Sequence, residues 1–149
     1  MTEIRFHDLA SVPAERALPR LIETVLAEGA RAVVMAGSAE RVAALDAALW
    51  TYDPGSFLPH GSARDGNAER QPVYLTSSDE NPNAASVLVV TDGVVADRVE
   101  RFRLVLELFD GNVAPVVEAA RARWKAYRAA GHDLAYLRLA ASGAWERRG

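Results

Sequence analysis

The sequence contains no cysteine, one lysine and three histidines, and these shortages remove several classes of functional site. Without cysteine the chain has no disulfide, no thiolate metal ligand and no cysteine nucleophile, which fits a reducing compartment. The histidines, His7, His60 and His132, lie far apart in the sequence and lack the paired spacing of a histidine metal site. We therefore expect no metal centre, and we interpret the three as surface or core residues.

Long apolar runs are also absent. No stretch approaches the ~20 consecutive apolar residues that a membrane-spanning helix requires. The first residues, M-T-E-I-R-F-H-D, carry charges at Glu3, Arg5 and Asp8 where a signal peptide would be apolar. These features predict a cytoplasmic protein that does not associate with the membrane.

The motifs of common nucleotide-binding and hydrolytic enzymes are missing too. A phosphate-binding loop needs a lysine beside Ser or Thr after a Gly-rich turn, whereas Lys125 is followed by Ala126 in a helical segment. There is no G-x-G-x-x-G for a dinucleotide and no G-x-S-x-G around a serine nucleophile. Ser56 and His60 lie in an extended, Pro-containing segment, which is poor geometry for a Ser–His pair. We predict no cofactor and no catalytic residue, and we keep open an enzyme whose residues form no recognisable motif.

The overall composition is that of one soluble globular domain spanning residues 1–149. Hydrophobic residues make up 50% and charged residues 25% of the chain, with a net charge of -3. A protein that mainly grips phosphates is usually basic, so this balance argues against strong direct binding of nucleic acid. Any cationic site has to be a local patch.

Apolar runs alternate with segments of helical periodicity along the chain. The runs predict strands at residues 3–7, 31–36, 72–76, 86–90, 103–108 and 135–139, and the periodicity predicts helices at 13–28, 38–50 and 113–130. Ser38 is the expected N-cap of the second helix, and Gly29 and Gly131 are expected to end the first and third. Continuous apolar strands between helices favour an α/β fold of three layers with a mostly parallel sheet.

One unusual segment, residues 45–60, reads L-D-A-A-L-W-T-Y-D-P-G-S-F-L-P-H. A helix ends near Trp50 and Tyr52, a turn follows at 54–55, and Phe57 and Pro59 then continue in an extended stretch. Three large aromatic residues within eight positions, partly in a loop, are typical of a protein–protein contact. The alternative is that Trp50 and Phe57 only close the end of the core.

A second segment, residues 121–128, reads R-A-R-W-K-A-Y-R. At ~100° per residue, a helix places Arg121, Trp124, Lys125 and Arg128 within about a third of its circumference. Arg123 lies nearer the core and departs from this pattern. The positions expected to face the core are Val116, Ala119, Ala120, Tyr127 and Ala130.

Three cations on one helical face repel one another and become useful when an anion binds there. The indole of Trp124 offers that anion an apolar neighbour, and Lys125 is a compact, mobile point charge. An acidic partner that ends in a hydrophobic residue with a free carboxylate would match. The alternatives are a solvated helix face, the anion clamp of a small α/β enzyme, or a single-stranded nucleic-acid surface on which Trp124 stacks a base.

Both segments resemble the chi subunit family of bacterial DNA polymerase III. The shared motifs are L-D-A-A-L-W at 45–50, S-F-L-P-H at 56–60 and W-K-A-Y-R-A-A-G at 124–131, with weaker likeness at 17–21, 108–111 and 143–145. They follow the same order along essentially the whole chain. The resemblance implies a Rossmann-like α/β fold without a nucleotide site, in a non-catalytic subunit of the clamp-loader complex.

The resemblance also implies partners. Family members bind the acidic C-terminal tail of single-stranded-DNA-binding protein and the psi subunit of the clamp loader, and some engage an accessory repair helicase. The tail-binding positions carry over to Arg121, Trp124 and Lys125 with Trp50 nearby, and Arg128 is added to them from its place on the same helical face. The other partner surface carries over to Trp50, Phe57 and Pro59.

Two positions and one segment depart from the family pattern. Position 124 is Trp where some relatives have Tyr. Asp110 stands where some relatives are apolar, which would place an acidic group at the edge of a pocket for an acidic ligand. Residues 136–139 read Y-L-R-L in place of a frequent Y-W-Q-Q, so the packing of that segment is expected to differ.

Overall fold

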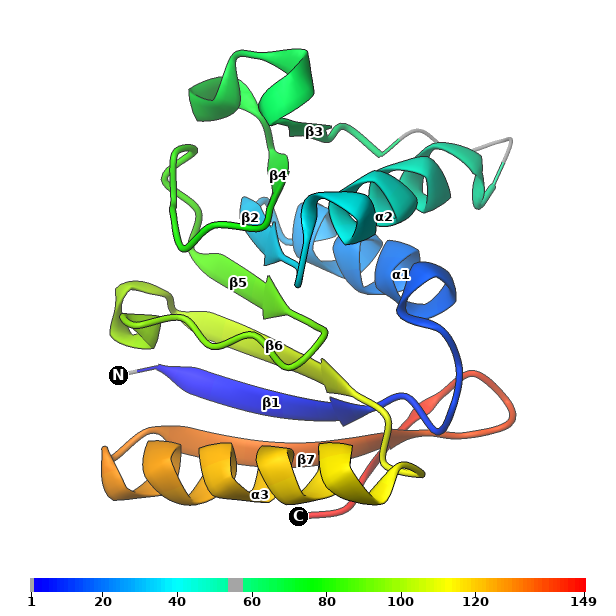
Figure 1. Ribbon diagram of the computed structural model, residues 1–149, viewed down its shortest axis with the longest axis vertical. Coiled ribbons are helices and arrows are strands. Elements are labelled where there is room, and N and C mark those ends of the chain that lie inside the picture. Colours follow the sequence, from blue (N-terminus) through cyan, green and yellow to red (C-terminus); the bar gives the residue numbers. More distant parts are fainter. Residues whose placement is uncertain (1, 54–57) are drawn as a thin grey trace.

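The computed structural model describes residues 2–53 and 58–149, which form three layers around a central sheet (Figure 1). Within the described residues the sheet has eight strands in the order β3-β4-β2-β5-β6-β1-β7-β8. All neighbouring strands are parallel except β7 and β8, which are antiparallel. The predicted α/β fold with a mostly parallel sheet is confirmed.

The bounds of the elements follow the predicted segments closely. The helices are α1 (Ala14–Ala27), α2 (Ala39–Thr51) and α3 (Ala114–Ala129), with short 3-10 turns η1 (Ala63–Asp65), η2 (Ala68–Arg70) and η3 (Val99–Arg101). The strands are β1 (Glu3–Asp8), β2 (Ala32–Met35), β3 (Gly61–Ser62), β4 (Val73–Thr76), β5 (Val87–Val90), β6 (Leu104–Phe109), β7 (Asp133–Leu139) and β8 (Trp145–Arg147). No strand was expected at β3, which is two residues long, and the resemblance alone pointed to the element at β8.

Local signals set the helix ends. The hydroxyl of Ser38 accepts a hydrogen bond from the backbone N–H of Arg41 at 3.1 Å and caps α2 as predicted. Gly29 and Gly131 follow α1 and α3 with φ values of +75° and +87°. A left-handed residue at this position allows the chain to leave the helix, and glycine adopts it without a steric penalty. Both glycines therefore end their helices as expected.

The two faces of the sheet carry separate cores, because successive side chains of a strand point in opposite directions. In β2, Val34 faces the core that α1 and α2 cover, whereas Val33 faces the core that α3 and η3 cover. Leu18 and Ile22 of α1 are 1% and 0% exposed on the first side, and Leu45 of α2 is 0% exposed. The helices α2 and α3 consequently lie on opposite faces of the sheet (Figure 1).

The orientation of α3 differs in part from the predicted one. Ala120 is buried and Tyr127 half-buried, as expected, but Val116, Ala119 and Ala130 are exposed, so their predicted core positions are wrong. The side that contacts the sheet contains Ala120, Arg123, Trp124 and Tyr127. The physical reason is Glu107 of β6, which is 1% exposed, faces α3 and takes Arg123 as its ion-pair partner.

Candidate functional site

Trp124 joins the core to the surface of α3. Its side chain is half-buried, and its ring packs edge-on against Phe6 of β1 with the ring centroids 5.2 Å apart and an interplanar angle of 63°. Phe6 is 1% exposed, and its ring in turn packs against that of Phe109 with the ring centroids 6.2 Å apart. Edge-to-face contacts of this kind hold aromatic rings in defined orientations. The indole is therefore a fixed wall, in contrast to a mobile surface side chain.

A cavity of about 410 Å³ opens beside the indole and is called the Trp124 cavity below. Three adjacent strands contribute one aromatic ring each: Phe6 from β1, Phe109 from β6 and Tyr136 from β7. The helix α3 contributes side chains one turn apart. The residues that line the cavity are Phe6, Phe109, Val117, Ala120, Arg121, Trp124, Tyr136, Arg148 and Gly149. An apolar cavity flanked by two guanidinium groups suits an apolar side chain that carries a neighbouring negative charge.

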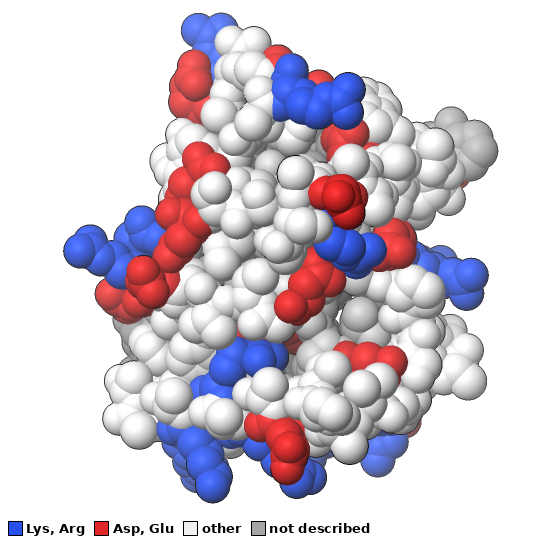
Figure 2. Space-filling model, viewed as in Figure 1, with Lys and Arg blue, Asp and Glu red and all other residues white. Residues whose placement is uncertain are grey.

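The cations of α3 surround Trp124 on its exposed side. Arg121 lines the Trp124 cavity, and Arg128 lines a second cavity of about 340 Å³ that Trp124 also borders. Lys125 is exposed and lies on the wall of neither cavity. Within residues 2–53 and 58–149, no salt bridge or hydrogen bond involves the side chains of these three cations. Basic side chains project along this edge of the molecule (Figure 2).

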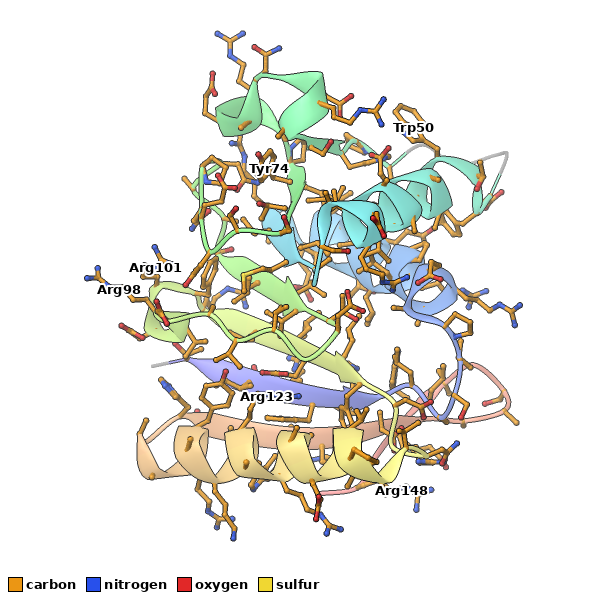
Figure 3. The ribbon with its side chains drawn as sticks, viewed as in Figure 1. Trp50, Tyr74, Arg98, Arg101, Arg123 and Arg148 are labelled. Carbon is orange, nitrogen blue, oxygen red and sulfur yellow. The ribbon has the colours of Figure 1, made fainter. Side chains whose placement is uncertain are left out.

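Arg123 is the ion-pair partner of Glu107, which explains why it does not share the helical face of Arg121, Lys125 and Arg128. Its Nε lies 3.1 Å from Oε1 of Glu107, and the hydroxyl of Tyr127 donates to Oε2 at 3.3 Å. Burial raises the pKa of Glu107, and Arg123 and Tyr127 oppose that rise by stabilising the ionised carboxylate. Burial and the neighbouring carboxylate raise the pKa of the Tyr127 hydroxyl. Figure 3 shows Arg123 between α3 and the sheet.

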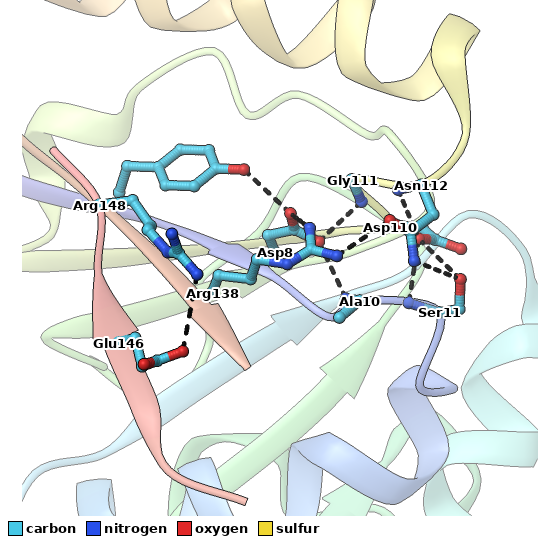
Figure 4. Close-up of polar contacts among 10 residues, drawn as sticks. Asp8, Ala10, Ser11, Asp110, Gly111, Asn112, Arg138, Glu146 and Arg148 are labelled. Atoms are coloured by element: carbon cyan, nitrogen blue, oxygen red, sulfur yellow. Dashed lines mark hydrogen bonds and ion pairs between the residues drawn. The ribbon is translucent and has the colours of Figure 1, made fainter. Parts of the chain in front are cut away.

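Asp8, at the carboxyl end of β1, holds one side of the Trp124 cavity in place. Its side chain is 0% exposed and accepts hydrogen bonds from the backbone N–H groups of Ala10 and Gly111 at 2.9 and 2.8 Å. The Tyr136 hydroxyl donates to it at 2.9 Å, and Arg138 forms an ion pair with it (Figure 4). Burial alone would raise the pKa of Asp8, but these hydrogen bonds and the guanidinium hold it below its usual value.

The Y-L-R-L departure at 136–139 is accommodated by this arrangement, because Tyr136 and Arg138 both donate to Asp8. Gly111 is required beside it, since a Cβ there would lie 1.9 Å from Oδ2 of Asp8. Sequence reasoning missed Asp8. The available signal was an acidic residue at the end of an apolar strand, together with a glycine in L-F-D-G, and neither reveals that the two segments meet.

Asp110 lies outside the Trp124 cavity. Its Oδ1 accepts hydrogen bonds from the backbone N–H groups of Ser11 and Asn112 at 3.0 and 2.9 Å, which fixes the turn after β6. The residue lines a different cavity, of about 510 Å³, at the carboxyl ends of β1, β5 and β6. Asp110 is therefore not among the residues that line the Trp124 cavity, and the expected acidic group at the edge of that cavity stays a prediction.

The 510 Å³ cavity lined by Asp110 lies where many α/β folds bind nucleotides. At this point the connections after β1 and β6 diverge to opposite faces of the sheet. Its cations already have carboxylate partners. Arg41 lies 2.7 Å from Glu15 and 3.2 Å from Asp92, and Arg123 is paired with Glu107. Among the described residues that line it, no guanidinium remains without an acidic partner to receive a phosphate.

Trp50 lies at the end of α2 and is 54% exposed. Its ring contacts that of His60 at 4.8 Å, and the His60 side chain is 0% exposed. The Nδ1 of His60 lies 2.6 Å from the carbonyl oxygen of Leu58, and its Nε2 lies 3.1 Å from a carboxylate oxygen of Asp46. These contacts support the indole from beneath and present its outer face to solvent.

The structure does not bring Trp50 to the cations of α3, and the expectation that it lies near them is wrong. Leu45 and Leu49 hold α2 on the α1 side of the sheet, whereas α3 covers the other side (Figures 1 and 3). Pro59 is half-buried and lies within the described residues that resume at position 58. Phe57 and Ser56 lie outside the described residues.

The three histidines occupy separate environments. His7 is 3% exposed and contacts the ring of Trp145 at 4.5 Å. Burial, with a smaller contribution from Arg5, lowers its pKa to about 4. His60 supports Trp50, and His132 borders the second cavity beside Trp124. Within residues 2–53 and 58–149, no group of three potential ligands could hold a metal ion, and no helix has the length and apolar character to cross a membrane.

Two sequence comparisons with known proteins point to the same family. The sequence model of the family described as DNA polymerase III chi subunit, HolC, matches residues 1–135. A curated relative from Rickettsia prowazekii (strain Madrid E), named "Probable DNA polymerase III subunit chi", is 39% identical over 75 residues. That alignment covers 50% of this chain and 46% of the relative, so the chain spans less than half of the relative's length.

Proposed function

The chain belongs to the DNA polymerase III chi subunit family, and on this basis we propose that it binds the acidic C-terminal tail of single-stranded-DNA-binding protein and links it to the clamp loader. In this role it is a cytoplasmic, non-catalytic adaptor formed by one domain. The observation that carries the proposal is the Trp124 cavity, an apolar hollow lined by Arg121, which has no acidic partner among the described residues, and by Arg148, whose partner Glu146 lies 3.7 Å away.

The tail fits this site through two kinds of contact. A terminal phenylalanine enters the cavity and packs against Phe6, Phe109 and Trp124. The acidic residues before it follow α3, where Arg121, Lys125 and Arg128 supply positive charge on consecutive turns. Small interfaces of this kind have modest affinity, in the micromolar range. Several tails on coated DNA raise the effective concentration, so avidity compensates for weak individual contacts.

A second surface, formed by Trp50 and Pro59 and including Phe57 in its sequence, is proposed to bind the psi subunit or an accessory helicase. An indole that is 54% exposed and buttressed by a buried histidine is typical of an interface anchor. Because this surface and the Trp124 cavity lie on opposite faces of the sheet, both partners bind at the same time.

The cavity gives little support to the enzyme alternative. Its lining holds no Asp, Glu or His side chain, and its tyrosine, Tyr136, is engaged with Asp8. The described residues that line this cavity therefore offer no carboxylate or imidazole as a general acid or base. Direct binding of single-stranded nucleic acid is separated from tail binding by a mobility-shift assay with naked oligonucleotide at moderate salt.

The test is a titration of a labelled peptide carrying the last residues of single-stranded-DNA-binding protein, with and without its terminal phenylalanine. Arg121→Ala and Lys125→Ala are expected to weaken binding about three- to tenfold, and removal of the phenylalanine is expected to abolish it. Arg70→Ala, an exposed arginine on η2, is the matched control. Wild-type affinity in both α3 variants would exclude this site.

A further inference from the structure

Arg148 reaches the Trp124 cavity from a part of the chain that the family model does not match. It follows β8, which pairs antiparallel with β7. The backbone N–H of Arg148 donates to the carbonyl of Tyr136 at 2.7 Å, and the N–H of Tyr136 donates to the carbonyl of Gly149 at 3.0 Å. These two hydrogen bonds place Arg148 beside the tyrosine whose ring lines the cavity.

The guanidinium of Arg148 is available to a ligand. Its ion-pair partner among the described residues is Glu146, at 3.7 Å, and the two side chains are 55% and 56% exposed (Figure 4). A pair at this distance and exposure contributes little in water. A carboxylate delivered to the mouth of the cavity can replace Glu146, since a guanidinium binds a carboxylate through two parallel hydrogen bonds.

The arrangement of the cations indicates which carboxylate Arg148 receives. Arg121 is the first of a row that continues along α3 to Lys125 and Arg128, and such a row suits consecutive acidic side chains. Arg148 stands apart from this row, in the segment after β8, and lines the same apolar cavity as Arg121. If the last side chain of a peptide fills the cavity, its own α-carboxylate lies at the cavity mouth.

We propose, resting on the proposed function, that Arg148 is a specificity-determining residue that binds the α-carboxylate of the peptide residue occupying the Trp124 cavity. The segment after residue 135 thereby completes a site for an acidic peptide terminus. Internal acidic segments, which lack an α-carboxylate, lose this contact. The site selects chain ends over internal sequences of the same charge.

The experiment uses a fluorescein-labelled peptide of four aspartates, a glycine and a C-terminal phenylalanine, in free-acid and amidated forms. Binding to the full chain is followed by fluorescence anisotropy. Arg148→Ala is expected to weaken the free-acid peptide about fivefold. The wild-type protein is expected to bind the amide about fivefold more weakly than the acid, and Arg148→Ala to cause no further loss with the amide.

Two variants of β8 serve as controls. Arg147→Ala removes a neighbouring exposed cation that does not line the cavity, and it should change the affinity less than twofold. Glu146→Gln removes the competing carboxylate and should tighten binding of the acid form about twofold without affecting the β7–β8 backbone pairing. Circular dichroism compares the folding of all variants.

The outcomes separate this proposal from the function on which it rests. Equal loss for acid and amide in Arg148→Ala, or wild-type affinity in that variant, overturns the assignment of Arg148. If Arg121→Ala still weakens the peptide, tail binding stands. If the wild-type protein binds neither peptide form, both proposals fail together.

Discussion

The ring of Trp124 rests edge-on against the ring of Phe6, with 5.2 Å between their centroids. This contact joins the cavity-lining side of α3 to β1, which lies between β6 and β7 in the sheet. The same indole therefore serves the core and the cavity wall. Its substitution should change stability and binding together, in proportions that depend on the replacement.

Trp124→Ala is expected to lower the free energy of unfolding by about 2 kcal/mol, less than for a fully buried aromatic residue because the side chain is half-buried. Peptide affinity should fall more than about tenfold, since one wall of the cavity is removed. Trp124→Tyr keeps an aromatic ring and should retain most of both properties. Urea unfolding and peptide anisotropy provide the two measurements. Unchanged affinity in the alanine variant would show that the cavity does not hold the ligand.

Asp8→Asn tests the hydrogen-bond centre behind Tyr136. The amide nitrogen cannot accept the hydrogen bonds that the carboxylate receives, so we expect a loss of about 3 kcal/mol at pH 7. The pKa of Asp8 is lowered in the folded protein. Its contribution is therefore complete above the unfolded-state pKa of about 3.9 and disappears as pH falls through the folded value.

The difference between wild type and Asp8→Asn should consequently shrink below about pH 4. Urea unfolding at pH 7 and at pH 3 measures it. A difference that stays constant over this interval would show that the ionised form of Asp8 is not the stabilising species.

Arg123→Ala leaves the buried carboxylate of Glu107 without its guanidinium partner. Removing one member of a buried pair costs about 3–5 kcal/mol. Because burial already raises the pKa of Glu107, the variant should become less stable as pH rises through that raised pKa, where ionisation must occur without compensation. Adding Glu107→Gln should recover part of the loss at neutral pH. Unfolding curves at pH 5 and pH 8 give the comparison, and equal losses at both would contradict this mechanism.

The Arg123→Ala variant also distinguishes the arginine of α3 that pairs with Glu107 from Arg121, which lines the Trp124 cavity. Arg123 does not line the Trp124 cavity, so the folded Arg123→Ala protein should bind the acidic peptide with nearly wild-type affinity. Arg121→Ala is expected to show the reverse: the free energy of unfolding should change little, and the affinity for the acidic peptide should fall. Two arginines two positions apart would thus differ in every measured property.

The sequence predicted the sheet and helices because their signals are local. Apolar runs, the Ser38 cap and the glycines after two helices each act within a few residues, and those elements appear where expected. The orientation of α3 was harder to predict, since it depends on Glu107, which lies at a distance in the chain. A helical wheel places the charged Arg123 unexpectedly near the core. Its ion pair with the buried Glu107 makes it part of the side of α3 that packs against the sheet.

The candidate site was likewise predictable from the sequence only where its residues lie close together in the chain. Its cationic, aromatic stripe is a local pattern within α3 and could be recognised from the sequence. Its other walls come from β1, β6, β7 and the segment after β8, which the sequence does not bring together. Arg148 was missed for that reason. Trp50 was placed near the stripe by resemblance, although the packing of Leu45 and Leu49 holds its helix on the other face.

Salt dependence distinguishes a charged peptide site from an apolar one. Exposed ion pairs are screened within a Debye length, which falls from about 10 Å at 0.1 M to about 3 Å at 1 M ionic strength. Peptide affinity should therefore fall steadily as NaCl rises, and Arg121→Ala should show a shallower dependence because one contact is already lost. Anisotropy titrations at several salt concentrations measure both slopes. Parallel slopes would show that Arg121 makes no charge contact with the peptide.

Trp50→Ala tests the independence of the two proposed surfaces. The indole is more than half exposed, so its removal should lower stability by less than about 1 kcal/mol. Acidic-peptide affinity should remain at the wild-type value, because α2 and α3 lie on opposite faces of the sheet. Binding to the psi subunit, measured by calorimetry, should fall at least tenfold, as expected for an interface anchor.

Val95→Ala, which truncates another exposed apolar residue, is the control and should alter neither interaction. A Trp50→Ala variant that lost acidic-peptide binding would show that the two surfaces communicate through the sheet. A variant that bound psi normally would remove Trp50 from the proposed second interface. Since the peptide and psi assays use separate readouts, either result identifies which surface fails, and the Trp124 cavity is judged on its own variants.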